Sequence, residues 1–251
     1  MKPFVFQLPE RSNNGRCTVI AAAVTLFIML FANAAISDVV DDNLPPDSPQ
    51  AVKDSARSAA QGGLQQDKVI KLTRAMLQNK FSEQQIQRTH ALMVEAKNSG
   101  MPVEPIMNKA FEGMAKGVES ARIVSAMEAV QSRNAFSYQL AAQLSKNNSQ
   151  KTNLGNILSS AFSAGFTKED AEKINQIIHE RARSRNSERA YSLAVECFET
   201  ARDVSRLGVS SPAVANMLAA ALNKGFNSQD IRAMRSAFIV QARQSQPQNL
   251  A

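Results

Sequence analysis

Histidine and cysteine, the side chains most used for metal binding and nucleophilic catalysis, are scarce in this chain. The 251 residues include two histidines, His90 and His179, and two cysteines, Cys17 and Cys197. A zinc site needs several such ligands at short characteristic spacings, and a catalytic thiolate needs a base or cation that lowers its pKa. Neither pattern surrounds these residues. We therefore expect no metal and no cofactor, and we interpret Cys197 as a small core residue.

The acidic residues do not form a pattern typical of hydrolysis. A lytic cell-envelope hydrolase needs a carboxylic acid in an apolar cleft, facing a second carboxylate. The acids of this chain mostly alternate with lysine and arginine, as on the solvated face of a helix. The sequence also contains no Gly-x-Ser-x-Gly, Walker or Gly-x-Gly-x-x-Gly motif. We expect a non-enzymatic protein, with a cell-envelope hydrolase of the lytic type as the alternative.

Four arginines form a cluster that offers a candidate binding surface. Arg181, Arg183, Arg185 and Arg189 gather where one expected helix ends and the next begins. Cations near a helix C-terminus are favourable in themselves, so a merely solvated surface is the first interpretation and an anionic contact the alternative. The chain has a formal net charge of +7, but nucleic-acid binding would require a broader basic stripe with aromatic stacking partners. We interpret the four arginines as candidate contacts for an anionic envelope component and expect no nucleic acid.

A recurring turn indicates the elements that must position these side chains. Its four copies read Lys80-Phe81-Ser82, Gly117-Val118-Glu119, Gly165-Phe166-Thr167 and Gly225-Phe226-Asn227. Glycine can close a helix in the left-handed conformation, and the next residue can fold back onto that helix. The third residue is a helix N-cap in three copies. The structural turn residues are therefore Phe81, Ser82, Gly117, Gly165, Phe166, Thr167, Gly225, Phe226 and Asn227.

Apolar residues recur at matching distances after each turn and predict one buried helix face. Ile86, Ile123, Ala171 and Ile231 occupy the first of these positions. The fold class that follows is all-α: an irregular array of helical hairpins with about ten helices. The turns at 80, 117, 165 and 225 are unevenly spaced. We expect two helices between the first two turns, near 82–98 and 102–115. In each later interval we expect a third helix, near 134–147 and 187–207.

The N-terminal residues have the three parts of a secretory signal peptide. Basic residues precede an uncharged apolar run from Cys17 to Phe31, and Ala32-Asn33-Ala34 follows as a cleavage site. Cleavage after Ala34 predicts a secreted or periplasmic protein. An uncleaved segment would instead anchor the helical domain to the inner membrane, outside the cytoplasm, because the apolar run nearly spans a bilayer. Contact with the membrane is expected only through this segment.

The remaining chain divides by composition. Residues 35–64 carry several aspartates, Pro45-Pro46 and Gly62-Gly63, and they offer little apolar surface to offset the entropy of ordering them. We expect an unstructured linker there, with a short helix at 51–61 as the alternative. Residues 65–245 are expected to form the all-α helical-repeat domain, and 246–251 an unstructured tail.

One stretch of the helical region resembles a known kind of protein. It contains Gly100-Met101-Pro102-Val103-Glu104-Pro105, Asn108-Lys109-Ala110, Glu112-Gly113 and Ala115-Lys116-Gly117-Val118. This stretch is similar to a segment of uncharacterised exported bacterial helical proteins. The resemblance implies a bacterial helical protein without an assigned activity, and it transfers no catalytic residue.

Together these features predict an exported, non-enzymatic helical scaffold that binds a protein or an envelope component. Stacked helical hairpins commonly form extended binding surfaces, which favours a binding role. The alternatives are the lytic-type hydrolase and a membrane-anchored structural protein.

Overall fold

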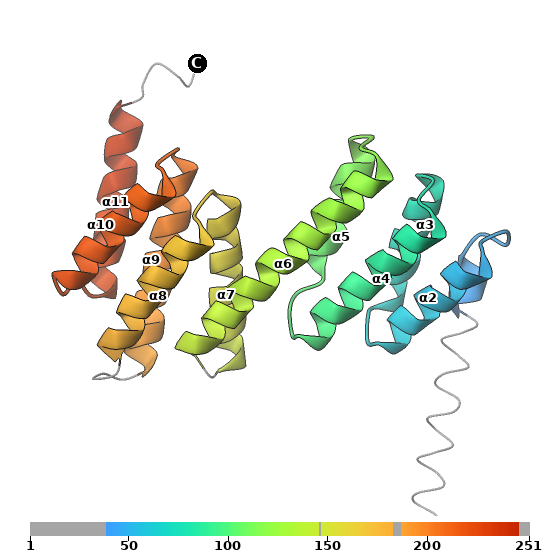
Figure 1. The fold of residues 1–251 in the computed structure, drawn as a ribbon, viewed down its shortest axis with the longest axis horizontal. Coiled ribbons are helices and arrows are strands. Elements are labelled where there is room, and N and C mark those ends of the chain that lie inside the picture. Colours follow the sequence, from blue (N-terminus) through green and yellow to red (C-terminus); the bar gives the residue numbers. More distant parts are fainter. Residues whose placement is uncertain (1–38, 146, 183–186, 246–251) are drawn as a thin grey trace, which may run out of the picture. The chain divides into compact units, whose positions relative to one another are not determined.

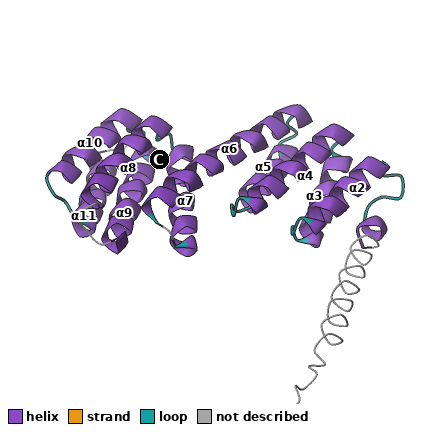
Figure 2. Cartoon of the chain, turned by 60° about the horizontal axis from the view of Figure 1, so that its bottom comes forward, coloured by secondary structure: helices purple, strands orange, loops and turns teal. Residues whose placement is uncertain are grey.

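The computed structural model describes residues 39–145, 147–182 and 187–245, and this part of the chain contains helices and no strand (Figures 1 and 2). The prediction of an all-α array is confirmed. A short helix over 39–43 precedes ten longer ones. These are α2 (Gln50–Gln61), α3 (Gln66–Gln78), α4 (Glu83–Asn98), α5 (Glu104–Ala115), α6 (Ser120–Leu144), α7 (Asn148–Ser163), α8 (Lys168–Ala182), α9 (Ser187–Arg206), α10 (Ser211–Asn223) and α11 (Ser228–Ser245). Among the described residues, no helix is long and apolar enough to cross a membrane.

The four predicted turns close helices in the left-handed conformation. The backbone angle φ is +59° at Lys80, +65° at Gly117, +102° at Gly165 and +88° at Gly225. After Gly165, the amide of Phe166 donates to the carbonyl of Ala161 at 3.1 Å. This bond is typical of the Schellman motif, which satisfies carbonyls at a helix end. The turns are therefore helix C-caps, as the sequence predicts.

The predicted N-caps are also formed. Ser82 and Gln85 make a reciprocal capping box, in which the Ser82 amide donates to Gln85 Oε1 at 2.8 Å and the Gln85 amide donates to Ser82 Oγ at 3.3 Å. Asn227 Oδ1 accepts from the Gln229 amide at 2.8 Å. Three further glycines, Gly63, Gly100 and Gly208, have φ between +68° and +87°. They close helices as the four predicted turns do, but the recurring turn pattern did not include them.

The helix expected at 134–147 is not a separate element. Residues 120–144 form one helix, α6, of 25 residues. The segment joining the two expected helices contains no glycine or proline, the residues that normally interrupt a helix. Asn134 is buried inside α6, where its Oδ1 accepts from Ser159 Oγ of α7 at 2.6 Å. The added helix expected at 187–207 is confirmed as α9.

The prediction of an unstructured linker over 35–64 is wrong for the part that the structure describes. Residues 39–43 and Gln50–Gln61 are helical. The buried residues of this segment are Val40, Leu44, Val52, Ala56, Ala59 and Ala60. Of these, Val52, Ala56, Ala59 and Ala60 lie on one small-residue face of α2, which packs as the buried side of an amphipathic helix. A charged contact adds to it, since Arg57 lies 3.4 Å from Asp41 and 2.9 Å from Asp54.

The chain divides into two compact units, Met1–Ala91 and Leu92–Ala251, where we expected a single domain over 65–245. The division falls inside α4. In the first unit, Leu72, Met76 and Ile86 are fully buried. The second unit contains α5–α11, and the predicted signal peptide 1–34 and tail 246–251 lie outside the described residues.

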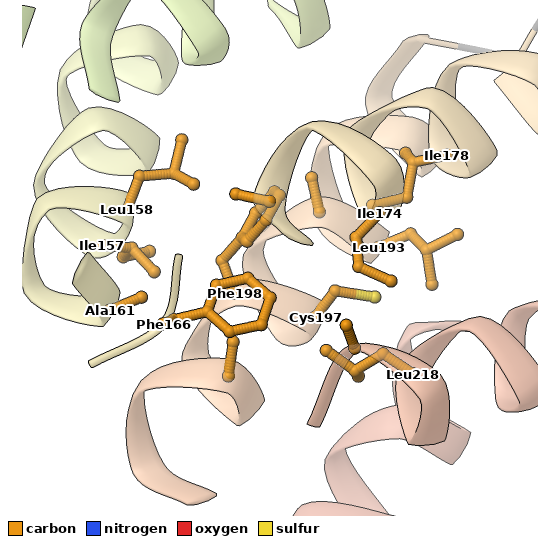
Figure 3. Packing of buried hydrophobic residues seen from close by; sticks show 14 of the residues in the cluster. Ile157, Leu158, Ala161, Phe166, Ile174, Ile178, Leu193, Cys197, Phe198 and Leu218 are labelled. Carbon is orange, nitrogen blue, oxygen red and sulfur yellow. The ribbon is translucent and has the colours of Figure 1, made fainter. Parts of the chain in front are cut away.

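In the second unit, α7, α9 and α11 form a row of parallel helices. Gln150 and Asn153 of α7 hydrogen-bond Glu188 and Tyr191 of α9. Glu196 and Glu199 of α9 pair in the same parallel sense with Arg232 and Arg235 of α11. The core lies between this row and α8 and α10, where Phe166, Ile174, Cys197, Phe198 and Leu218 point toward one another (Figure 3). A helical row of this kind presents the outer faces of successive helices side by side.

Candidate functional site

The arginine cluster lies beside a hollow of about 540 Å³ in the second unit. Arg181, at the end of α8, and Arg189, in the first turns of α9, both line it. Arg183 and Arg185 lie outside the described residues. The other lining residues are Ile178, Glu188, Ala190, Ser192, Leu193, Asn227, Ser228 and Gln229. The described walls of the hollow are therefore the end of α8, the start of α9 and the start of α11.

Arg181 and Arg189 differ in what their guanidinium groups do. Arg181 Nη1 donates to the carbonyls of Leu222 and Phe226, both at 3.0 Å. It thereby satisfies carbonyls where α10 ends, which is a structural role of the kind expected for a cation at a helix C-terminus. Arg189 is exposed and, within the described part of the chain, makes no ion pair or side-chain hydrogen bond. Arg189 is consequently the better placed of the two for a ligand.

A second hollow of about 310 Å³ continues from the first. The two share Ser192, Ser228 and Gln229, so together they form one depression along the first half of α9. We call it the α9 depression. The second hollow adds Asn153, Tyr191, Val195, Glu196 and Arg232 to the lining. Tyr191 is held in place by Asn153, whose side-chain amide donates to the tyrosine oxygen at 2.8 Å.

A charged joint between α9 and α11 closes the far end of the α9 depression. The Glu196 side chain is only 4% exposed. Arg232 Nε donates to its Oε1 at 2.9 Å, and Arg235 Nη2 donates to its Oε2 at 2.9 Å. Arg235 also donates to Glu199 Oε2 at 2.5 Å. The hydrogen bond to Glu196 raises the pKa of Arg232 above its ordinary value. The joint fixes α11 against α9 and so fixes the walls of the depression.

Sequence reasoning missed this joint, because it interpreted the acidic residues of the chain in general as parts of solvated helix faces. A signal for it exists in the spacing. The two glutamates are three residues apart on α9, and Arg232 and Arg235 are three residues apart on α11. Such pairs lie on one face of their helices. Two faces with the same spacing and opposite charge match one another when the helices run parallel.

His90 occupies a different polar site, in the first unit. Thr73 Oγ1 donates to the carbonyl of Val69 at 2.8 Å, so it can only accept from His90 Nε2, which lies 2.9 Å away. Nδ1 is then the acceptor, and Ser55 Oγ donates to it at 2.5 Å. Burial lowers the pKa of His90 to about 4. We call these three side chains the His90 triad; its imidazole is neutral at neutral pH.

A serine that donates to an imidazole also resembles a nucleophile with its base. Catalysis near neutral pH needs a base whose pKa lies close to that pH, whereas that of His90 is about 4. Ser55 lies in the middle of α2, where backbone amides are engaged in the helix and cannot stabilise an oxyanion. The His90 triad is therefore a structural joint between α2, α3 and α4.

The remaining cysteine and histidine of the described residues lie in opposite surroundings. Cys197 is fully buried, and burial raises the pKa of its thiol to about 12, so it remains a protonated core residue. His179 lies exposed near the end of α8. Within the described ranges, no group of three or more histidine, cysteine or acidic residues is placed to hold a metal ion.

Comparison of the chain with protein-family models, with curated proteins and with solved structures finds no match. The resemblance around Gly100–Val118 therefore stays a prediction.

Proposed function

We propose that this protein is an exported, non-enzymatic helical scaffold that binds a protein or envelope partner in the α9 depression. The observation that carries the proposal is the composition of its wall. Arg189 supplies a guanidinium without a partner in the described part, the partly buried Val195 supplies apolar surface, and Ser192 and Gln229 supply polar groups. Ligand sites commonly combine apolar walls with a few polar groups in hollows of about 300–1,000 Å³.

Rigidity of the surrounding helices supports binding. The depression lies between α9 and α11, which the Glu196 joint connects, and α7 is tied to α9 through Gln150 and Asn153. A site whose walls are already fixed loses little conformational entropy when its ligand arrives. The same contacts favour a scaffold over an enzyme, because both carboxylate oxygens of Glu196 already accept hydrogen bonds from arginines.

Photo-cross-linking in the cell of origin tests the proposal. A photoreactive residue is placed at Gln229, on the wall of the α9 depression, and, as a control, at Arg206, exposed in the last turn of α9. We expect one discrete adduct from position 229 and at most a trace from position 206. Equal adducts from both positions, or none from 229, would contradict a binding role for the depression.

Export rests on residues 1–34, which lie outside the described residues. N-terminal sequencing of the protein purified from cells tests it. A chain that begins at Ala35 supports secretion to the periplasm or beyond. A chain that begins before Ala32 would instead favour the membrane anchor.

A further inference from the structure

We infer that the His90 triad is a pH-sensitive contact, which holds α2 against α3 and α4 and releases α2 when the imidazole gains a proton. The inference concerns the first unit alone and does not depend on binding in the α9 depression. Its premise is that His90, on α4, lies between two hydroxyl groups that belong to two other helices. A change in the charge of the ring therefore acts where all three helices meet.

The neutral ring fits its surroundings because each of its nitrogens has one partner of the right kind. Ser55 Oγ of α2 donates to Nδ1 at 2.5 Å, and Nε2 donates to Thr73 Oγ1 of α3 at 2.9 Å. A proton on Nδ1 would make both nitrogens donors. Ser55 would then have to accept from the ring, and its own hydroxyl proton would need another acceptor. Protonation therefore breaks the existing hydrogen bond between His90 and α2 and leaves the one to α3 in place.

The helix faces around the ring supply no charge that would compensate an imidazolium. Residues three or four positions apart share a helix face. At these positions from the three triad residues, the described helices have uncharged side chains only: Ala51, Val52, Ser58 and Ala59 on α2, Val69, Ile70, Met76 and Leu77 on α3, and Ile86, Gln87, Met93 and Val94 on α4. A charge on the ring would therefore be buried without a counter-charge, which is unfavourable.

The charged residues closer to the triad in sequence point elsewhere. Within two positions of its members, these are Lys53, Asp54, Arg57, Lys71, Arg74 and Arg88. Asp54 pairs with Arg57 at 2.9 Å, and Lys53 donates to the carbonyl of Pro46 at 3.2 Å. Lys71, Arg74 and Arg88 are exposed. Burial is accordingly the cause that lowers the pKa of His90.

The helix that leaves should be α2, because it buries the smallest side chains. Its buried residues are Val52, Ala56, Ala59 and Ala60, whereas α3 buries Val69, Ile70, Leu72, Thr73 and Met76. Burial stabilises a helix roughly in proportion to the apolar area removed from water. The hydrogen bond to His90 is therefore a larger share of what holds α2 than of what holds α3. We expect α3 and α4 to stay packed after α2 is released.

Hydrogen exchange of the full-length protein, followed by mass spectrometry and corrected for the effect of pH on amide chemistry, tests the inference. Between pH 7.5 and 4.5 the protection of α2 should fall about 70-fold, the ratio that follows from a pKa of about 4 in the packed state and 6.5 in the released one. The protection of α10, which contains no histidine, should change far less. His90→Gln stays neutral and should abolish the fall. The matched control His179→Gln, at an exposed position, should retain it.

A second measurement needs no substitution at His90. In the His179→Gln protein, His90 is the one histidine of the chain, so the Cε1 proton signal in NMR spectra reports it alone. This signal should keep its neutral position down to about pH 5. Titration near pH 6.5, equal protection of α2 at both pH values, or a fall that persists in His90→Gln overturns the inference. So does simultaneous loss of protection in α2, α3 and α4, because the whole unit would then unfold without a separate release of α2.

Discussion

Each of the two units buries a polar side chain between helices, and the two side chains are stabilised differently. In the first unit, the His90 triad joins three helices without a formal charge. In the second, Glu196 joins α9 to α11 as a carboxylate held by two arginines. A neutral group can be buried once both of its hydrogen-bonding atoms have partners, whereas a buried charge needs counter-charges as well.

The contrast between the neutral His90 triad and the charged Glu196 joint bears on where a binding surface can form. The neutral triad contains no charged side chain and has no arginine among its hydrogen-bond partners. The charged joint brings arginines to the outer face of α9 and α11, beside the depression that Arg189 lines. The stability of the two units should accordingly respond to different conditions: to pH in the first and to salt in the second.

Removal of the buried carboxylate should have the largest effect. Glu196→Ala removes the buried carboxylate that binds both Arg232 and Arg235, while Arg235 keeps its ion pair with Glu199. We expect the free energy of unfolding of the second unit to fall by about 3–4 kcal/mol, because two hydrogen bonds to a charged group are lost, each worth about 1.5–2 kcal/mol. Urea unfolding followed by circular dichroism measures it. Glu172→Ala, at an exposed position of α8, is the control and should cost less than about 0.5 kcal/mol. Equal losses for the two variants would show that the joint is not a buried ion pair in solution.

Acid should weaken the first unit through His90. Its pKa is about 4 in the folded chain against 6.5 ordinarily, so the unfolded state binds more protons between these values. Stability is therefore full above about pH 6.5 and falls as the pH decreases toward 4, by about 3 kcal/mol in total. The measurement is unfolding of the first unit from pH 7.5 to 4.5 in the wild type and in His90→Gln. The difference between the two curves should shrink as the pH falls; parallel curves would contradict a neutral buried imidazole.

Substitutions in the equivalent turns of the two units should change stability by a smaller amount. At Gly165, where φ is +102°, an added Cβ would meet no atom within 4 Å, so Gly165→Ala tests backbone strain alone. We expect a loss of about 1 kcal/mol in thermal or urea unfolding. The first unit places Lys80 in the equivalent turn at φ +59°. Lys80→Gly relieves that strain and should therefore be neutral or slightly stabilising. A loss of stability at Lys80→Gly as large as that at Gly165→Ala would overturn the equivalence of the turns.

Salt should give the smallest and most selective effect. The Arg232 side chain is 67% exposed, so its attraction to Glu196 is screened by ions. Raising NaCl to about 1 M should increase hydrogen exchange in α11 more than in α3, whose joint contains no formal charge. Mass spectrometry of the two helices measures this. An equal increase of hydrogen exchange in α11 and α3 would contradict the distinction between a charged joint and a neutral one.

Much of the fold could be predicted from local patterns, because its turns are local. A glycine at positive φ followed by an apolar residue and a cap is visible in sequence at Gly165 and Gly225. Local patterns were less informative for features that depend on packing between helices. The alanine-rich face of α2 has low hydrophobicity, and its order depends on burial against other helices. The burial of Asn134 in the middle of α6 depends on Ser159 of α7, which donates to its side chain from another helix.

The candidate site could be predicted only in part. Clustering of arginines at the α8–α9 connection identified Arg181 and Arg189, which the structure places on the wall of one hollow. Their different roles depend on the carbonyls of Leu222 and Phe226, which lie more than a helix away in sequence. The Glu196 joint likewise depends on the parallel register of two helices that no local pattern specifies.

The most direct test of the central claim, binding in the α9 depression, is the yield of the Gln229 photo-adduct in two variant backgrounds. Arg189→Glu should abolish the adduct, whereas Arg206→Glu should leave its yield at the wild-type level. An adduct that survives Arg189→Glu at full yield, with the protein folded, would contradict the account.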